Sequence, residues 1–443
     1  MKHLLKQLKA YRKESILGPL FKLLEAGFEL MVPLLVAAMI DQGVKLGDKS
    51  VIVRMSLMMV GLGLIGLLCS VTAQYFAAKA AVGSTTRLRR ALFAHLQTLS
   101  YTELDTIGAS TMLTRLTSDM NQVQSGVNLT LRLALRSPFV VFGAMVMAFT
   151  IDVHAASVFA IVIPILFAVV FGVMIVCIPL YRKVQARLDR VLGMTRENLT
   201  GVRVLRAFGR EEEQKREFSA RNDALTKEQN HVGRISVLLN PVTYVIINLA
   251  IVALIRTGAL RVESGALSQG DVIALYNYMS QILVELIKLA NLVLNITRAV
   301  ACCNRIGAVL EIESSQHSPQ TEPETTADAP AIEFRRAGLR YAGAGGDALD
   351  GISFRAEKGQ TIGVIGGTGS GKTTLVNLIP RFYDATEGSV LVDGIPVEQY
   401  PLESLRRRIG VVPQKAVLFH GTIRENLLWG DPDADDGTLR EAL

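Results

Sequence analysis

The sequence predicts a multi-domain membrane protein: an all-α part with six membrane-spanning helices, followed by part of an α/β domain. Three observations lead to this fold class. Half of the 443 residues are hydrophobic and only 20% are charged. Stretches such as Ala156–Leu180 contain no charge over a length that spans a bilayer core. A strand, a glycine-rich loop and a helix then follow one another within residues 361–382.

The apolar residues gather in six runs of membrane-spanning length. We expect the spans at about 16–40, 52–77, 133–151, 155–180, 236–260 and 271–296. The connections alternate, because three are short and two are about 55 residues long. The short connections lie near Asp41–Arg54, Thr150–His154 and Arg256–Asp271.

The charges predict the orientation of these spans. The net charge is +7, and the cations cluster in the N-terminal segment and in the two long connections, whereas the short connections have little net charge. By the positive-inside tendency, both ends and both long connections are cytoplasmic. Since the cations lie where membrane topology needs them, nucleic-acid binding is disfavoured.

The two long connections have the composition of helices. They lack clusters of proline, glycine and serine, and stretches such as Leu88–Leu99 keep helical periodicity. We therefore expect the spans to continue out of the membrane as paired arms, each turning at its tip through a short crossing helix. Thr102–Ser110 and Gly201–Glu213 are the expected crossing helices.

Ionisable residues occur inside the first and last spans, where charge is costly and often functional. They are Lys22, Glu25 and Glu29 in the first span and Glu285 and Lys288 in the last, where the polar Gln281 lies in the same stripe. Two interpretations remain open. Residues spaced three apart can neutralise each other within one helix, or the polar groups can line a cavity for a translocated molecule.

A polar, proline-containing stretch separates the two parts of the chain. We expect a transmembrane domain over 1–311, a solvated linker over 312–331 and part of a nucleotide-binding domain over 332–443. The last part begins with sequence typical of strands, and the β-branched stretch TIGVIG, residues 361–366, is predicted to be a buried strand.

The loop after this stretch matches GxxxxGK[ST] at every fixed position. Its glycines allow a tight turn whose N–H groups point at phosphate oxygens, while a lysine reaches the β- and γ-phosphates and a hydroxyl ligates Mg²⁺. The predicted phosphate-binding residues are Gly366, Gly367, Thr368, Gly369, Ser370, Gly371, Lys372, Thr373 and Thr374, with Thr373 as a metal ligand. The implied cofactors are ATP and Mg²⁺, in a partial α/β P-loop NTPase domain.

With six spans followed by this loop, the whole chain resembles an ATP-binding cassette (ABC) exporter of the half-transporter type. The resemblance implies that Tyr341 stacks on adenine. It also implies that Gln414, in Leu405–Leu427, is catalytic and reaches Mg²⁺ and the attacking water. Glu387–Gly394 resembles the strand and turn after the first helix of the family's domain. Phe419 and Ile423 would receive the crossing helices, so the arms would be levers between nucleotide and membrane.

The resemblance further implies a homodimer or heterodimer with a second half-transporter, in a lipid bilayer, expected to be the bacterial inner membrane. The substrate class stays open between amphipathic drugs, lipids and peptides. The family's signature motif, its Asp-Glu pair and its switch histidine are not found, and we expect a C-terminally truncated chain that does not hydrolyse ATP alone. The alternatives are a non-hydrolysing nucleotide-binding regulatory subunit of a heteromeric transporter and, less favoured, a P-loop kinase with a membrane anchor.

Overall fold

The computed structural model describes residues 1–324 and 328–443, and the chain forms two compact units. The first contains Met1–Gln97 and Ala109–Ile312, and the second contains Thr98–Gly108 and Glu313–Leu443. The expected linker, 312–331, includes residues 325–327, which lie outside the described residues.

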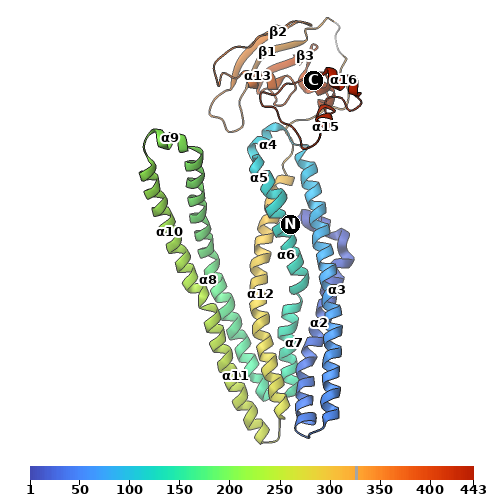
Figure 1. Cartoon of the computed structure of the whole chain (residues 1–443), viewed down its shortest axis with the longest axis vertical. Helices are drawn as coiled ribbons and strands as arrows, with labels where there is room; N and C mark the ends of the chain where they lie inside the picture. The colour runs from blue at the N-terminus through green and yellow to red at the C-terminus, as the bar shows by residue number, and fades with distance from the viewer. Residues whose placement is uncertain (325–327) are drawn as a thin grey trace. The chain divides into compact units, whose positions relative to one another are not determined.

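The first unit is entirely helical. Its elements are α1 (Lys2–Leu8), η1 (Lys9–Tyr11), α2 (Arg12–Ala38), η2 (Met39–Val44), α3 (Lys49–Leu96), α5 (Ala109–Thr114), η3 (Arg115–Asp119), α6 (Met120–Leu133), α7 (Arg136–Ile151), α8 (Val153–Thr200), α9 (Val202–Ala207), α10 (Glu211–Val237), α11 (Leu239–Glu263) and α12 (Gln269–Leu310). The core of this unit is formed by α2, α7, α8, α11 and α12. Helix α12 packs against α2, α6, α7, α8 and α11, and it lies among them in Figure 1.

The prediction of six membrane-spanning helices is confirmed. Among the described residues, six helical stretches are long and apolar enough to cross a membrane. Many of their large apolar side chains point outward; Leu57 and Leu68 on α3, for example, are 66% and 68% exposed. Such surface is costly in water but is compatible with contact with lipid tails.

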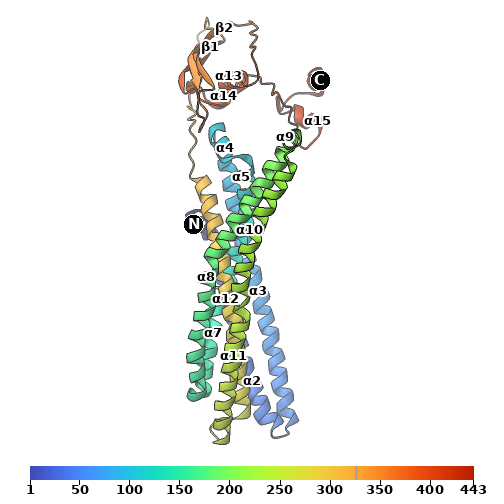
Figure 2. The same ribbon diagram turned by 90° about the vertical axis from the view of Figure 1, so that its left-hand side faces the viewer.

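The predicted helical arms are also present. Helices α3 and α8 have 48 residues each, well beyond the length needed to span a bilayer core. The long helices α8 and α10 run side by side, with α9 at their tip (Figures 1 and 2). Helix α4 (Tyr101–Ile107) and α9 lie where the crossing helices were expected.

Acidic residues fix the starts of two long helices. Asp48 accepts hydrogen bonds from the Ser50 and Val51 N–H groups at the start of α3. Asp152 accepts from the Ala155 N–H at 2.7 Å at the start of α8, and its second carboxylate oxygen accepts from Arg261 at 2.5 Å. These caps satisfy N–H groups that lack intrahelical partners, so the short turns end one helix and begin the next at defined residues.

The second unit contains a small antiparallel sheet. Its elements are α4, β1 (Ile332–Leu339), β2 (Leu349–Ala356), α13 (Lys372–Leu378), β3 (Glu387–Val392), β4 (Ile395–Pro396), η4 (Val397–Gln399), α14 (Leu402–Arg407), α15 (Ile423–Leu427) and α16 (Asp436–Glu441). The strand order is β2-β1-β3-β4, and Phe334 of β1 lies between Phe354 of β2 and Val390 of β3. Residues of α13 and α14 pack on this sheet and complete its core.

The prediction of a buried strand at 361–366 is wrong for this structure. The segment has no strand geometry, and Ile365 is 95% exposed. The physical reason is the lack of a neighbour: among the described residues no other strand pairs with it, and a strand persists only when its N–H and C=O groups are bonded across a sheet.

Candidate functional site

The glycine-rich loop leads directly into α13. Lys372 is the first residue of this helix, and the Leu375 N–H donates to the Gly371 carbonyl at 2.8 Å as its first turn closes. Gly369 and Gly371 have φ angles of +84° and +85°, in the left-handed region that side chains rarely adopt. The two glycines therefore allow the chain to reverse sharply before the helix begins.

A close approach also restricts position 371. A Cβ atom added to Gly371 would lie 2.8 Å from the Ala348 carbonyl oxygen and 2.8 Å from a methyl carbon of Leu349. The start of β2 and the residue before it therefore pack directly against the turn that starts α13. Backbone conformation and packing both require glycine at this point.

The ammonium group of Lys372 lies over the loop. Its Nζ donates to the carbonyl oxygens of Gly366 and Gly367 at 2.8 and 2.7 Å, and lies 3.4 Å from Ser370 Oγ. The loop thus surrounds a cation, and the first N–H groups of α13 have no intrahelical acceptor. This is a donor set suited to a polyphosphate. The hydroxyl of Thr373 has no hydrogen-bond partner among the described residues, which leaves its oxygen available to Mg²⁺.

Tyr341 and Thr374 are brought together by the fold. The Tyr341 hydroxyl and Thr374 Oγ1 are 3.0 Å apart, and Thr374 is buried. The side chain of Thr374 is therefore engaged with Tyr341. The ring of Tyr341 packs edge-on against Tyr383, with their centroids 5.1 Å apart.

Gln414 lies in an exposed segment without helix or strand between α14 and α15. Among the described residues it makes no hydrogen bond to the glycine-rich loop. The predicted turn after β3 is present, since Asp393 and Gly394 both have positive φ angles. The structure thus brings together the loop, Lys372, Thr374 and Tyr341. Among the described residues, no direct hydrogen bond joins Gln414 to this group.

Sequence reasoning missed the residues that hold α4 in the second unit. The Tyr383 hydroxyl donates to Asp105 Oδ2 at 2.5 Å, and the Tyr101 ring lies 4.9 Å from that of Phe382. Burial, and then the bond to Asp105, raises the pKa of Tyr383 well above its usual range. The adjacent aromatic residues Phe382 and Tyr383, which follow the phosphate-loop helix, were the sequence feature that could have indicated this contact.

The expected contact site for this crossing helix is therefore wrong in one respect. Helix α4 packs on Phe382 and Tyr383, whereas Phe419 stacks on Trp429 and Ile423 is 72% exposed. A cavity of about 260 Å³ lies between α4 and the strand end at Tyr341. Tyr383 therefore contacts both Tyr341, next to the phosphate loop, and α4.

A second polar centre, built on Arg136, lies among the helices of the first unit. Its guanidinium donates to Glu285 Oε1 and to Glu29 Oε2, both at 2.6 Å. Glu285 also accepts from Ser137 at 2.8 Å and from Lys288 at 2.8 Å. The sequence pattern gave Arg136 no partner, because the residues that it joins lie on α2 and α12, far apart in the chain.

Part of the predicted local pairing is present. Lys22 donates to Glu25 at 2.5 Å and also to Ser70 on α3, and Lys288 donates to Glu285. Glu29, one turn after Glu25, turns to Arg136 instead. Both interpretations of the ionisable residues thus find support, because Glu29, Gln281, Glu285 and Lys288 also line a cavity.

Comparisons with known proteins cover both units. The family model described as "ABC transporter transmembrane region" matches residues 15–286, and that described as "ABC transporter" matches residues 349–443. The chain is 36% identical over 425 residues to an uncharacterized ABC transporter ATP-binding protein of Mycobacterium tuberculosis, covering 96% of this chain and 73% of the relative. It is 33% identical over 442 residues to the ABC transporter ATP-binding protein YfiB of Bacillus subtilis, covering 100% of this chain and 77% of the relative.

A third relative has a stated activity. The chain is 30% identical over 357 residues to the ATP-dependent lipid A-core flippase of Aromatoleum aromaticum, covering 81% of this chain and 59% of the relative. The fused order of a six-helix membrane region and a nucleotide-binding region agrees with the expected half-transporter arrangement. The chain is a multi-pass integral membrane protein and belongs to the ABC transporter family.

Proposed function

We propose that this chain is one protomer of an ATP-driven exporter that moves an amphipathic or lipidic molecule across a membrane. The proposal rests on one observation: a single chain contains both a phosphate loop around Lys372 and six helices of membrane-spanning length. The relative named as a lipid A-core flippase supports an amphipathic cargo. Drugs and peptides remain open as cargo.

The residues of the loop fit ATP with Mg²⁺. Lys372 and the loop N–H groups would hold the β- and γ-phosphates, and Thr373 would provide a hydroxyl ligand for the metal. Tyr341 would stack on adenine and Gln414 would orient the attacking water, as the family resemblance implies. The Mg²⁺ ion, when bound, neutralises charge on the phosphates. The protein contributes positioning, because phosphoryl transfer needs little covalent chemistry from it.

The second crossing helix supports a dimer. At the tip of the α8–α10 arm, Val202 and Val204 of α9 are exposed, and Phe208, the residue after α9, is 76% exposed. Apolar side chains at such a tip are stabilised when a second protein surface covers them. We propose that a second half-transporter, identical or related, provides that surface. We also propose an inner-membrane location with both ends cytoplasmic, from the cations of the N-terminal segment and the arms.

The first experiment measures ATP binding by the full chain in lipid nanodiscs. Lys372→Ala should lower ATP affinity at least tenfold, because the loop loses its only side-chain ammonium. Lys215→Ala, on the exposed face of α10, is the matched control and should bind as the wild type does. Equal ATP binding by Lys372→Ala and wild type would show that the nucleotide assignment is wrong.

A second experiment tests transport with a partner half-transporter supplied. ATP-dependent accumulation of a fluorescent phospholipid in inside-out vesicles is then expected for wild type and should be lost in Lys372→Ala. ATP binding without turnover, even when a partner chain is supplied, would instead favour the regulatory subunit.

A further inference from the structure

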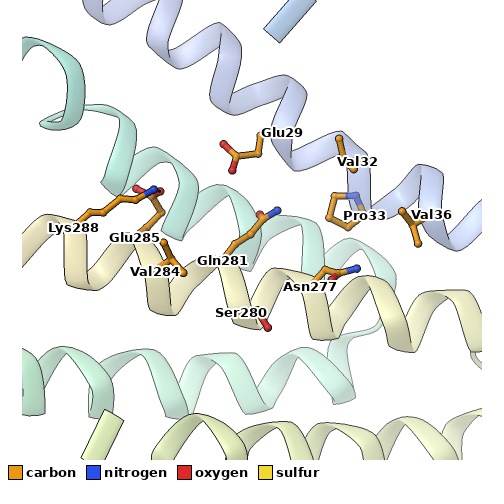
Figure 3. Close-up of a pocket in the computed structure, with 10 residues that line it drawn as sticks. All are labelled: Glu29, Val32, Pro33, Val36, Asn277, Ser280, Gln281, Val284, Glu285 and Lys288. Atoms are coloured by element: carbon orange, nitrogen blue, oxygen red, sulfur yellow. The ribbon is translucent and has the colours of Figure 1, made fainter. Parts of the chain in front are cut away.

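A polar cavity of about 460 Å³ lies between α2 and α12 in the first unit. Figure 3 shows Glu29 and Pro33 on α2 across from Gln281 and Asn277 on α12. Its volume lies in the range of small-ligand sites, about 300–1,000 Å³. The lining residues are Glu29, Val32, Pro33, Val36, Asn277, Ser280, Gln281, Val284, Glu285 and Lys288.

The cations near this cavity are already neutralised by protein groups. Arg136 is only 7% exposed on its side chain and donates to two carboxylates. Lys288 donates to Glu285. Glu285 in turn is buried and receives hydrogen bonds from Arg136, Ser137 and Lys288. Each cation is therefore paired with a carboxylate, although Lys288 keeps two further N–H donors and the Arg136 Nε has no partner among the described residues.

The acceptors are less well satisfied. Glu29 bonds Arg136 through Oε2 alone, and its side chain is 41% exposed. Gln281 Oε1 is buried without a hydrogen-bond partner among the described residues. Pro33 has no N–H to donate to the Glu29 carbonyl four residues earlier. An unpaired acceptor away from water is costly, so a ligand that brings donors is favoured.

Apolar side chains stand beside these acceptors. Val32 and Val36 of α2 and Val284 of α12 form part of the wall. The site therefore combines a partly free carboxylate and an unpaired amide oxygen with surface that suits a hydrocarbon chain.

We infer that this cavity binds the ammonium group of an amphipathic primary amine, with Glu29 and the Gln281 oxygen as its acceptors. The inference rests on the proposed export function and names the class of cargo. The ammonium offers three N–H donors and a positive charge to the carboxylate, and the attached chain lies along the valines. An anionic head group would have to share Lys288 with Glu285, and it would lie beside the carboxylates of Glu29 and Glu285.

The test measures binding of tritiated dodecylamine to the full chain in nanodiscs, without ATP, with dodecanol and sodium dodecanoate as competitors of equal chain length. Wild type should bind the amine at least about tenfold more tightly than the alcohol. Glu29→Gln should remove this preference, and Glu29→Asp should restore part of it. Glu25→Gln is the matched control, since Glu25 lies one turn away, pairs with Lys22 and does not line the cavity.

Three results would overturn the inference. They are equal binding of amine and alcohol by wild type, an amine preference that survives in Glu29→Gln, and tighter binding of dodecanoate that is lost in Lys288→Gln. Lys372→Ala should keep the amine preference, because that site lies in the other unit. Failure of the nucleotide assignment and failure of this inference are therefore distinguishable.

Discussion

Replacement of Arg136 by methionine tests the ion network among the helices. The change keeps most of the apolar stem but removes the guanidinium that bonds Glu29 and Glu285. Glu285 is 3% exposed as a residue, so its charge cannot be hydrated in place. Arg136→Met should therefore destabilise the first unit.

The size of the effect follows from the remaining partners. Breaking a buried ion pair costs about 3–5 kcal/mol, because an uncompensated charge is left behind. Glu285 keeps the hydrogen-bond donors Ser137 and Lys288, so the loss of stability due to Glu285 should lie near the lower end of this range. Glu29 is partly exposed and should add less than about 1 kcal/mol. The expected loss is about 3–4 kcal/mol.

The assay is pulse proteolysis of the full chain across an SDS titration, which reports the folded fraction. Arg256→Met is the control, because Arg256 is exposed on α11 and should change stability by less than about 0.5 kcal/mol. The double variant Arg136→Met/Glu285→Gln removes the unpaired charge and should be more stable than Arg136→Met alone. A loss below about 1 kcal/mol in the single variant, or a double variant that is the less stable of the two, would refute the reasoning.

Three further predictions concern the second unit. Gly371→Ala should lower ATP affinity at least tenfold, because Gly371 has a positive φ and is closely packed. Gly363→Ala is the control and should keep the affinity, because no atom lies within 4 Å of a Cβ added there. Equal ATP affinities of the two variants would contradict this account. Tyr383→Phe removes the hydrogen bond to Asp105 and should cost about 1 kcal/mol. Faster amide hydrogen exchange in α4 would show this, and unchanged exchange would argue against it. Two arginine hydrogen bonds lower the pKa of Glu333 from 4.5 to about 2, so its stabilisation is full above pH 4.5 and is lost as the pH falls toward 2. In Glu333→Gln, the protection of the β1 and β2 amides from hydrogen exchange should therefore differ less between pH 5 and pH 3 than in wild type. An unchanged difference would show that Glu333 does not cause the acid sensitivity.

Local patterns in the sequence predicted the six spans, the long arms, their crossing helices and the loop around Lys372. Each of these features depends on residues close together in the chain: an uncharged apolar run, a helical period, or fixed glycine spacings before a lysine. A bilayer-spanning helix satisfies its own backbone hydrogen bonds, so its sequence alone is enough to identify it. The roles proposed for Tyr341 and Gln414 remain predictions from family resemblance.

Tertiary structure decided which polar groups meet. Arg136 joins Glu29 and Glu285 only because α7 packs beside α2 and α12, and no sequence spacing encodes that contact. Packing likewise brought Tyr383 to Asp105. The stretch 361–366 has strand composition but no strand partner among the described residues. A helix forms its bonds within itself, whereas a strand, an ion network or a cavity needs partners from elsewhere in the chain, which only the folded arrangement provides.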